Sequence, residues 1–488
     1  MSYKFTVPAG WIESQLQEYC LKVADGTHDS PKKTEQGKLL VTSKNIIGGT
    51  LDLSKSYRIS EEDFDDVNRR SKVDKHDVLL SMIGTVGEVC LIEREPDFAI
   101  KNVGLLKNQD SLKAKWLYFY LTSPQAQAQI KERLRGTTQQ YLPLGEIRKF
   151  PIIYPSSRSE MQEMVGVLAA IQNKIQLNHQ INQTLEQMAQ AIFKSWFVDF
   201  EPVKAKIAAL EAGGSAEDAL LGAMQAISGK GEAELTRLQA EQPEQYAELR
   251  ATAELFPSAM QDSELGEIPV GWRSGQLKDI CEFQNGYAFK SKDWSDAGFS
   301  VVKIGSVKPA FVDIQSCSYV EDKTIVGLER FELFAGDLLV GMTGYPGETG
   351  LVPKTENRVF LNQRVGRLKP RQSNLKALLY CSVRAPDFKQ YVEGQSHGSA
   401  QANVSGKAIG QYPITIPTDS VVGHFSGLID PLIQQKLNLN AEATTLAITR
   451  DTLLPRLISG EIAAPEIKDQ SQEAAGYSDI GDGVAIDE

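Results

Sequence analysis

The sequence predicts an α+β protein of two similar domains joined by two long antiparallel helices, which pair as a coiled coil. Three observations support this fold class. The stretch 159–200 carries an uninterrupted heptad repeat, a related stretch recurs near residue 440, and six sequence blocks recur in the same order at offsets of 260–262 residues. An internal repeat of this kind predicts a pseudo-twofold arrangement, in which each half supplies one domain and one helix.

The first half begins with a domain predicted over residues 1–157. Its block DVLLSMIGTVGEVCLI (77–92) contains an apolar run that ends on glycine, and FPIIYP (150–155) alternates toward a proline, so both are predicted strands. A helix or helix pair is expected over 112–134. The domain is therefore predicted to mix helices and strands.

The first long helix is predicted over residues 158–200. Its seam is apolar at both ends and polar at its centre: Met161, Met164, Leu168, Ile171, Ile175, Asn178, Asn182, Leu185, Ala189, Ile192 and Trp196. Such a narrow stripe needs a long partner helix, and a buried asparagine fixes register by demanding a hydrogen bond. A long amphipathic helix on an α-helical domain is the simpler alternative, which the repeat disfavours.

Two acidic segments account for the net charge of −11. Residues 201–265 hold twelve acidic and five basic side chains, and residues 461–488 hold eight and one. The first segment is rich in alanine and glutamate, which predicts a helical insertion between the halves. The tail, 463–488, is polar and is predicted to be disordered. The remaining chain carries +3, a balance that permits DNA binding.

The second half repeats the first. Its domain is predicted over 266–420, where DLLVGMTGYPGETGLV (337–352) answers the block at 77–92, and a helical stretch is expected over 375–392. The second long helix is predicted over 421–462. There IQQKLNLN (433–440) echoes IQNKIQLN (171–178), and Pro431 and Pro455 are expected to kink or end the helix locally. The residues predicted to form the helix–helix and partner interface are Leu168, Ile171, Ile175, Asn178, Asn182, Leu185, Ile192, Trp196, Phe197, Leu437, Asn440 and Leu454.

Signatures of catalysis, metal binding and membrane insertion are missing from the sequence. There is no Walker A loop, no HExxH, no GxSxG, no Rossmann fingerprint and no methyltransferase tetrapeptide. The five cysteines and five histidines lack ligand spacing, no apolar run approaches the roughly 18 residues of a membrane span, and the first residues do not resemble a signal peptide. A cytoplasmic, non-catalytic chain without a membrane partner is expected.

Polar loops in the two domains are the candidate DNA contacts. GTTQQYLPL (136–144) and GSAQANVSG (398–406) occupy matching places, and their hydroxyl and amide groups suit base edges or phosphates, although a polar surface loop is an equal alternative. GTVG (84–87) and GYPG (344–347) are predicted turns, with phosphate binding as the alternative. The candidate DNA-binding residues are Lys32, Lys33, Lys44, Asn45, Thr85, Thr137, Thr138, Gln139, Gln140, Tyr141, Lys290, Lys303, Thr343, Tyr345, Ser399, Gln401 and Asn403.

These blocks resemble the specificity subunit of a type I restriction-modification enzyme. The resemblance rests on IPVGW (268–272), DVLLSMIGTVG, QRVGRLKP (363–370), FKSWFVDFEPV (193–203) and LLPRLISGEI (453–462). It covers roughly residues 5–200 and 266–462. The insertion at 204–265 departs from the family pattern, and the resemblance does not explain it.

The resemblance implies two target-recognition domains, each of which reads one half of a split, asymmetric DNA site. The helices would act as a ruler: about 55 Å at ~1.5 Å per residue corresponds to roughly one and a half turns of duplex at ~34 Å per turn. Double-stranded DNA, two modification subunits that methylate adenine N6, and restriction subunits are the implied partners. S-adenosylmethionine, ATP and Mg²⁺ would be bound by those subunits, and no cofactor by this chain. The alternative from another class is a non-catalytic coiled-coil scaffold that binds proteins rather than DNA.

Overall fold

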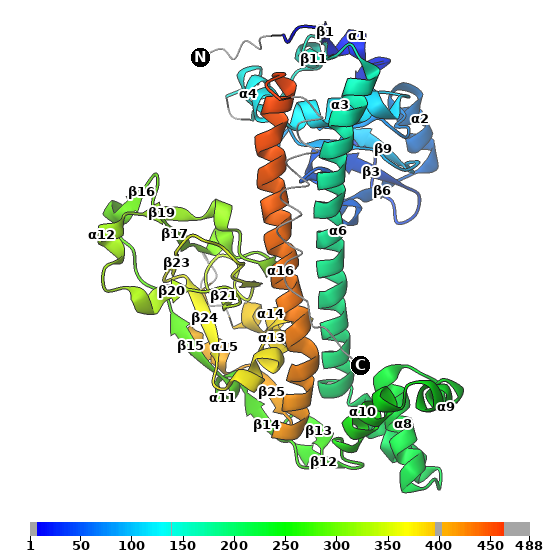
Figure 1. Ribbon diagram of the computed structural model, residues 1–488, viewed down its shortest axis with the longest axis vertical. Helices are drawn as coiled ribbons and strands as arrows, with labels where there is room; N and C mark the ends of the chain where they lie inside the picture. Colours follow the sequence, from blue (N-terminus) through cyan, green and yellow to red (C-terminus); the bar gives the residue numbers. More distant parts are fainter. Residues whose placement is uncertain (1–6, 138, 396–402, 463–488) are drawn as a thin grey trace, which may run out of the picture. The chain divides into compact units, whose positions relative to one another are not determined.

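The computed structural model describes residues 7–137, 139–395 and 403–462 (Figure 1). The chain divides into two compact units, the first formed by Met1–Gln176 with Thr444–Glu488 and the second by Leu177–Ala443. Each unit contains one globular domain and a part of both long helices. The predicted disordered tail, 463–488, lies outside the described residues.

The globular domain of the first unit is built on two small sheets and a closing strand pair. In the four-stranded sheet, with order β2-β10-β7-β8, all pairs are antiparallel, whereas β3 pairs with β9 in parallel in the three-stranded sheet β6-β3-β9. β1 pairs with β11 and so joins the two ends of the domain. The strands are β1 Trp11–Gln15, β2 Lys22–Asp25, β3 Lys38–Thr42, β4 Ile46–Ile47, β5 Thr50–Leu51, β6 Tyr57–Ile59, β7 Val78–Ser81, β8 Val89–Leu91, β9 Phe98–Lys101, β10 Val103–Lys107 and β11 Pro151–Pro155.

The helices of this domain begin at side-chain caps. Asp110 accepts hydrogen bonds from the first backbone N–H groups of α3, and Ser123 ends α3 and caps α4, which starts on Pro124. The helix pair expected over 112–134 is thus present. The aromatic residues of α3, among them Trp116 and Tyr120, are buried in the core. The helices are α1 Leu16–Tyr19, α2 Glu61–Ser71, α3 Ser111–Thr122, α4 Pro124–Glu132 and α5 Leu144–Arg148.

The globular domain of the second unit repeats this topology. Its sheet β15-β24-β21-β22 matches β2-β10-β7-β8, β17 pairs with β23 in parallel as β3 does with β9, and β14 pairs with β25 as β1 does with β11. The strands are β14 Arg273–Gln276, β15 Cys281–Asn285, β16 Trp294–Ser295, β17 Phe299–Val302, β18 Ala310–Phe311, β19 Ser318–Val320, β20 Glu332–Leu333, β21 Leu338–Gly341, β22 Thr349–Leu351, β23 Val359–Leu361, β24 Val365–Pro370 and β25 Pro413–Ile416. The helices are α11 Leu277–Ile280, α12 Asp322–Ile325, α13 Lys376–Arg384, α14 Pro386–Gly394 and α15 Gly406–Gly410. The predicted α+β fold with an internal repeat is confirmed.

Each domain is followed by a long helix, α6 Arg158–Phe197 or α16 Asp419–Ile458 (Figure 1). In the first unit, the start of α6 and the end of α16 share a core that includes Met164, Leu168 and Leu457. In the second unit, the end of α6 and the start of α16 share another core, with Phe193 and Phe425 in ring contact. The two helices are therefore antiparallel partners, as the heptad seam predicts.

Pro431 and Pro455 are expected to kink or end the second helix; the helix ends at neither, because α16 continues through both. A proline removes one N–H donor and leaves the carbonyl four residues earlier without its helical partner. For Pro431 that carbonyl belongs to Gly427, and both residues lie on the exposed face of the helix, where water can bind the carbonyl. Ile429 and Ile433 are buried on the opposite face and hold this turn in place.

The insertion predicted at 201–265 is helical, with α7 Glu201–Glu211, α8 Ala216–Ser228, α9 Glu232–Glu241 and α10 Pro243–Glu254. Leu220, Met224 and Leu235 form a small core of its own. A hairpin of β12 Met260–Ser263 and β13 Gly266–Pro269 follows, so the predicted boundary at 265/266 falls inside a hairpin. The hairpin places Ile268 and Trp272 at the entrance to the second domain.

An aromatic cluster joins the insertion to the long helices within the second unit. Trp196 and Phe197, from the SWFVDF motif, lie with ring centroids 5.0 Å from Phe256 and 4.8 Å from Phe425, respectively. Phe197 also lies 5.7 Å from Trp272. The motif is therefore the core in which α6, α16, the insertion and the second domain meet.

Candidate nucleic-acid interface

In the first domain, two loops far apart in sequence are held side by side. The backbone N–H of Leu142 donates to the carbonyl of Met82 at 2.9 Å, and Tyr141 forms β-bridges with both Ile83 and Arg135. We call residues 82–87 and 135–142 the first loop pair. Thr85, Thr137, Gln139, Gln140 and Tyr141 are exposed on it, whereas Thr138 lies outside the described residues. The pair presents hydroxyl, amide and aromatic groups to solvent on one edge of the domain.

The second domain repeats this arrangement. The backbone N–H of Val404 donates to the carbonyl of Met342 at 2.9 Å, and the Thr343 hydroxyl donates to Asn403 Oδ1 at 2.9 Å. We call residues 342–347 and 403–406 the second loop pair. Tyr345 is 69% exposed at its tip. Ser399 and Gln401 lie outside the described residues.

The glycine motifs in both loop pairs are turns that require the left-handed backbone region. Gly84 has φ +80° and Gly87 φ +99°, and the second copy has Gly344 at φ +78° and Gly347 at φ +82°. A side chain at Gly87 would approach Gln127, whose amide donates to the Gly87 carbonyl. These glycines serve the turn geometry, as predicted.

Of the candidate lysines in the first domain, Lys44 lies nearest the loop pair. It is exposed on the short 3₁₀ turn Ser43–Asn45, and the hydroxyl of Thr85 donates to the Ser43 carbonyl at 3.4 Å. Lys32 and Lys33 are exposed on the segment between β2 and β3, with the Lys33 ammonium 5.2 Å from the centroid of a tyrosine ring, Tyr57. In the described part of the chain, neither lysine forms a hydrogen bond or an ion pair with the first loop pair.

The prediction that Asn45 contacts DNA is wrong, because the structure gives its side chain a structural role. It is 2% exposed, its Nδ2 donates to the Asp52 carbonyl at 3.0 Å, and its Oδ1 accepts from both the backbone N–H and the hydroxyl of Thr42. The amide is thus used inside the chain, where it closes the turn that carries Lys44. A buried, satisfied amide cannot read a base.

Replacing Asn45 with alanine is expected to destabilise the first domain by about 1–3 kcal/mol, because the Asp52 carbonyl and the Thr42 N–H would lose their buried partner. Lys44→Ala, one residue earlier, is the matched control and should change the free energy of unfolding by less than about 0.5 kcal/mol. Denaturant titration of both variants checks the result. Equal stability of the two variants would contradict the structural role.

In the second domain the two candidate lysines differ. Lys290 is exposed, and its backbone N–H donates to the Asp293 carboxylate at 2.7 Å. Lys303 is half-buried, with its ammonium 3.5 Å from the centroid of the Trp294 ring, and burial lowers its pKa. Its cation is therefore engaged with an aromatic ring, which makes Lys290 the freer side chain for a phosphate.

A basic cavity beside the second loop pair escaped the sequence interpretation. It has a volume of about 1020 Å³, and its lining includes Lys278, Arg364 and Lys407 together with Thr343 and Asn403. Its described lining contains no carboxylate, so the cavity suits phosphate oxygens or base edges. The remaining lining residues are Cys281, Phe283, Asn285, Met342, Gln363, Leu368, Val404, Ser405, Gly406, Gly410 and Gln411.

The sequence did contain a signal for this cavity. Gln363 and Arg364 open the repeated QRVGRLKP block, which the sequence interpretation treated only as part of the shared frame. In the structure both residues are exposed in the turn between β23 and β24, whereas Arg367, further along the block, is buried. One arginine of the block thus faces solvent and the other is structural.

The predicted interface residues of the long helices are largely internal. Leu168, Ile175, Asn178, Asn182, Trp196, Phe197, Leu437 and Leu454 are buried, and Ile171, Leu185, Ile192 and Asn440 are half-buried. The side-chain amide of Asn178 donates to Glu442 Oε2 at 2.8 Å and to the Leu439 carbonyl at 3.4 Å. The buried members thus lie in contacts within the chain and not on its surface.

Metal-ligating side chains are not gathered at any one place in the part of the chain that the structure describes. No cluster of three or more His, Cys, Asp or Glu side chains could hold a metal there. All five cysteines are free and buried, and burial raises the pKa of Cys20, Cys90 and Cys281 to about 12. Among the described helices, none is long and apolar enough to cross a membrane.

Two domains of one topology, each with a polar loop pair and each followed by a long helix, define a protein built from an internal duplication. Residues 8–187 and 269–438 match the family described as the type I restriction modification DNA specificity domain. The chain therefore belongs to the DNA specificity subunit family of type I restriction-modification systems.

Relatives in that family cover most of the chain. It is 32% identical over 354 residues to the HindI specificity subunit of Haemophilus influenzae, covering 68% of this chain and 73% of the relative. It is 21% identical over 400 residues to the MjaIX specificity subunit of Methanocaldococcus jannaschii, covering 80% and 79%. A solved S subunit from M. genitalium aligns with a TM-score of 0.46 at 16% identity, over 94% of this chain and 98% of that one.

Proposed function

We propose that each globular domain of this specificity subunit reads one half of a split DNA site, with its loop pair as the reading surface. The observation that carries the proposal is the repetition of the same loop pair, Met82–Leu142 and Met342–Val404, in two domains of one topology. The frame is shared, but the exposed side chains differ: Tyr141 and two glutamines in the first pair, Tyr345 and Asn403 in the second. Two different reading surfaces favour an asymmetric site.

The long helices set the distance between the two half-sites in this proposal. Each has 40 residues, or about 60 Å at 1.5 Å per residue, slightly longer than the sequence predicts. The helices share buried seams in both units, so neither half can slide along the other without exposing apolar side chains. A fixed helix length corresponds to a fixed number of unread base pairs.

Modification subunits dock on the exposed faces of the helices in this proposal. Leu177 and Met188 of α6 are exposed apolar side chains eleven residues apart, with Ile181 half-buried between them. This spacing places all three on one face of the helix. Those subunits would bind S-adenosylmethionine and methylate adenine N6, and restriction subunits would use ATP and Mg²⁺. In this proposal the chain itself is a non-catalytic cytoplasmic protein that binds no cofactor.

Exchange of residues 1–155 for the corresponding domain of another specificity subunit tests the independence of the two readers. We expect one half-site of the methylated motif to change and the other to remain, because the second loop pair is untouched. Sequencing of N6-methyladenine in a host that expresses the chain with its modification subunit measures both half-sites at once. A change in both half-sites would refute independent reading.

The protein-binding scaffold is the competing function, and DNA binding under salt separates the two. A reading subunit loses affinity for duplex DNA steeply as salt rises, because phosphate contacts release counterions. Fluorescence anisotropy of a labelled duplex that contains the recognised motif, titrated with the assembled complex at two salt concentrations, measures this loss of affinity. Absence of salt-dependent binding would favour the scaffold.

A further inference from the structure

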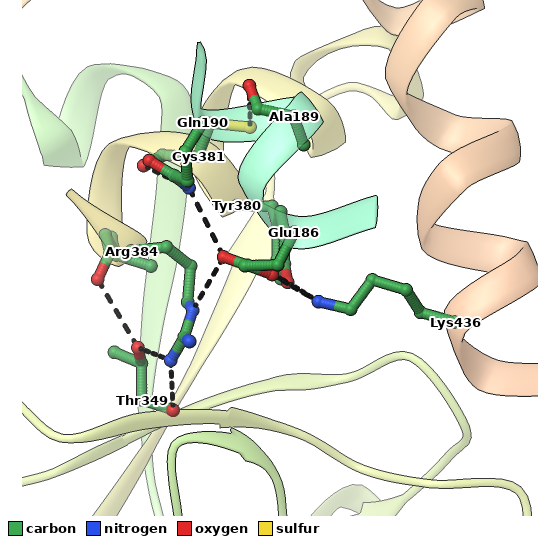
Figure 2. A network of polar contacts seen from close by, with 9 residues as sticks. Glu186, Ala189, Gln190, Thr349, Tyr380, Cys381, Arg384 and Lys436 are labelled. Atoms are coloured by element: carbon green, nitrogen blue, oxygen red, sulfur yellow. Dashed lines mark hydrogen bonds and ion pairs between the residues drawn. The ribbon is translucent and has the colours of Figure 1, made fainter. Parts of the chain in front are cut away.

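A buried polar network ties the second domain to both long helices (Figure 2). Glu186 of α6 lies between α13 and α16, and its carboxylate accepts hydrogen bonds from Lys436 of α16 and from Tyr380 and Arg384 of α13. The Lys436 ammonium also donates to the Tyr380 hydroxyl at 2.7 Å. All four side chains belong to the second unit. One carboxylate thus joins three helices.

The charges in this network depend on one another. Lys436 is 1% exposed, so its ammonium has no solvent to replace the carboxylate. Burial alone would raise the pKa of Glu186, but Lys436 and Arg384 outweigh it and hold the pKa below its ordinary value. Burial lowers the pKa of Lys436, and Glu186 opposes that effect. Removing the carboxylate would leave two cations beside each other in a poorly solvated place.

The network continues to the second loop pair. The Arg384 guanidinium donates to the backbone carbonyl of Thr349 at 2.9 Å and to its hydroxyl at 3.3 Å. Thr349 is the first residue of β22, which directly follows the turn of the second loop pair. Lys389 of α14 adds an ion pair to Glu348 at 2.9 Å. A displacement of α13 along α6 would therefore move the strand that bears the reading turn.

Among the described residues, the first domain has no counterpart of this network, although the repeat preserves two of its four side-chain types. At the offset of 262 residues, Tyr118 and Lys174 correspond to Tyr380 and Lys436, but Ile448 stands in place of Glu186 and Thr122 in place of Arg384. Ile448 is 57% exposed and cannot accept a hydrogen bond through its side chain. The first domain packs on an apolar core that includes Met164, Leu168 and Leu457 of the long helices. Its polar contacts to α6 are different ones, the ion pair of Asp110 with Arg158 and the hydrogen bond from the Trp11 indole to Glu160.

We propose that Glu186, Lys436, Tyr380 and Arg384 are positioning residues that fix the second domain in one register on the helix pair. A hydrogen-bonded ion pair is satisfied in one arrangement only. If α13 slipped along α6 by one helical turn of about 5.4 Å, the charges of the network would be left without partners in a poorly solvated place. The network thereby sets how strictly the spacer between the half-sites is read. This inference rests on the proposed function of the helices as a ruler.

The test measures methylation by the complete complex on a plasmid library of split sites whose spacers differ by one or two base pairs. Glu186→Gln keeps the shape of the side chain and removes its charge. Lys436→Met is a second variant that leaves Glu186 paired with Arg384 and Tyr380, so it is the milder change for folding. Lys174→Met, at the corresponding exposed position of the first half, is the matched control.

We expect the wild type and Lys174→Met to prefer one spacer length. In Glu186→Gln and Lys436→Met, the ratio of methylation at the preferred spacer to methylation at the other spacers should fall about tenfold, which corresponds to about 1.4 kcal/mol. Both half-site sequences should stay the same in all four proteins. A lowered melting temperature with unchanged spacer preference would show a purely structural role and overturn the inference. If the wild type itself accepts every spacer, the proposed ruler function is refuted together with this inference. If the wild type prefers one spacer and the variants keep that preference, this inference alone is refuted.

Discussion

Removal of one heptad from each long helix is expected to shorten the spacer of the recognised site by about three base pairs. Seven helical residues rise about 10.5 Å, and each base pair of a duplex rises about 3.4 Å. The half-site sequences should not change, because both loop pairs are left intact. Methylation sequencing of the deletion variant in its host measures the spacer and the half-sites together.

The positions of the deletions follow from the polar contacts of the seam. Deleting 173–179 from α6 and 441–447 from α16 removes Asn178 together with its acceptor Glu442. The hydrogen bond from Arg450 to Gln172 and the ion pair of Lys436 with Glu186 remain in the shortened helices. Because seven residues are one full period of the seam, the buried faces stay in phase.

A three-residue deletion in each helix is the control for this experiment. Removing 173–175 and 445–447 rotates the continuing seam by about 50° and takes its apolar side chains off the interface. That variant should lose methylation rather than change the spacer. If the heptad deletion leaves the spacer at its original length, the helices are not the ruler.

The α+β fold was predictable because each half of the chain carries the same pattern. The repeated blocks indicate two similar domains, and the heptad seam indicates two long helices. Neither inference requires knowledge of long-range contacts. The local rule for proline could not show that α16 continues through Pro431, because the rule takes no account of tertiary packing. Pro431 lies on an exposed face, whereas Ile429 and Ile433 on the opposite face are buried. Tertiary packing overrode a local preference there.

The candidate interface was only partly predictable, because a polar residue in a loop looks the same whether it faces solvent or the chain. Asn45 and Gln140 both carry an amide side chain in a predicted loop, yet Asn45 is buried and Gln140 is exposed. Arg364 was overlooked because it lies in a repeated block. The Glu186–Lys436 pair joins residues 250 positions apart, and only the antiparallel helix pairing brings them together.

Trp196→Ala is expected to be the most destabilising single substitution in the second unit, at about 3–5 kcal/mol. The indole is 2% exposed and lies against Phe256, Phe425 and the ring of His424, with which it stacks at 6.4 Å. Truncation would leave a cavity where the insertion meets both long helices. Thermal unfolding of the full chain should show the loss as a fall in midpoint of about 10 °C for this unit.

Val198→Ala is the matched control, two residues further along the same motif. Val198 is exposed, so its truncation should change the free energy of unfolding by less than about 0.5 kcal/mol. Because the Trp196 ring contacts Phe256 of the insertion and Phe425 of α16, Trp196→Ala should reduce co-purification of the modification subunit without changing either half-site in the methylation that remains. Equal effects of the two substitutions would mean that SWFVDF is a surface motif and that its aromatic side chains do not hold the insertion against the helices.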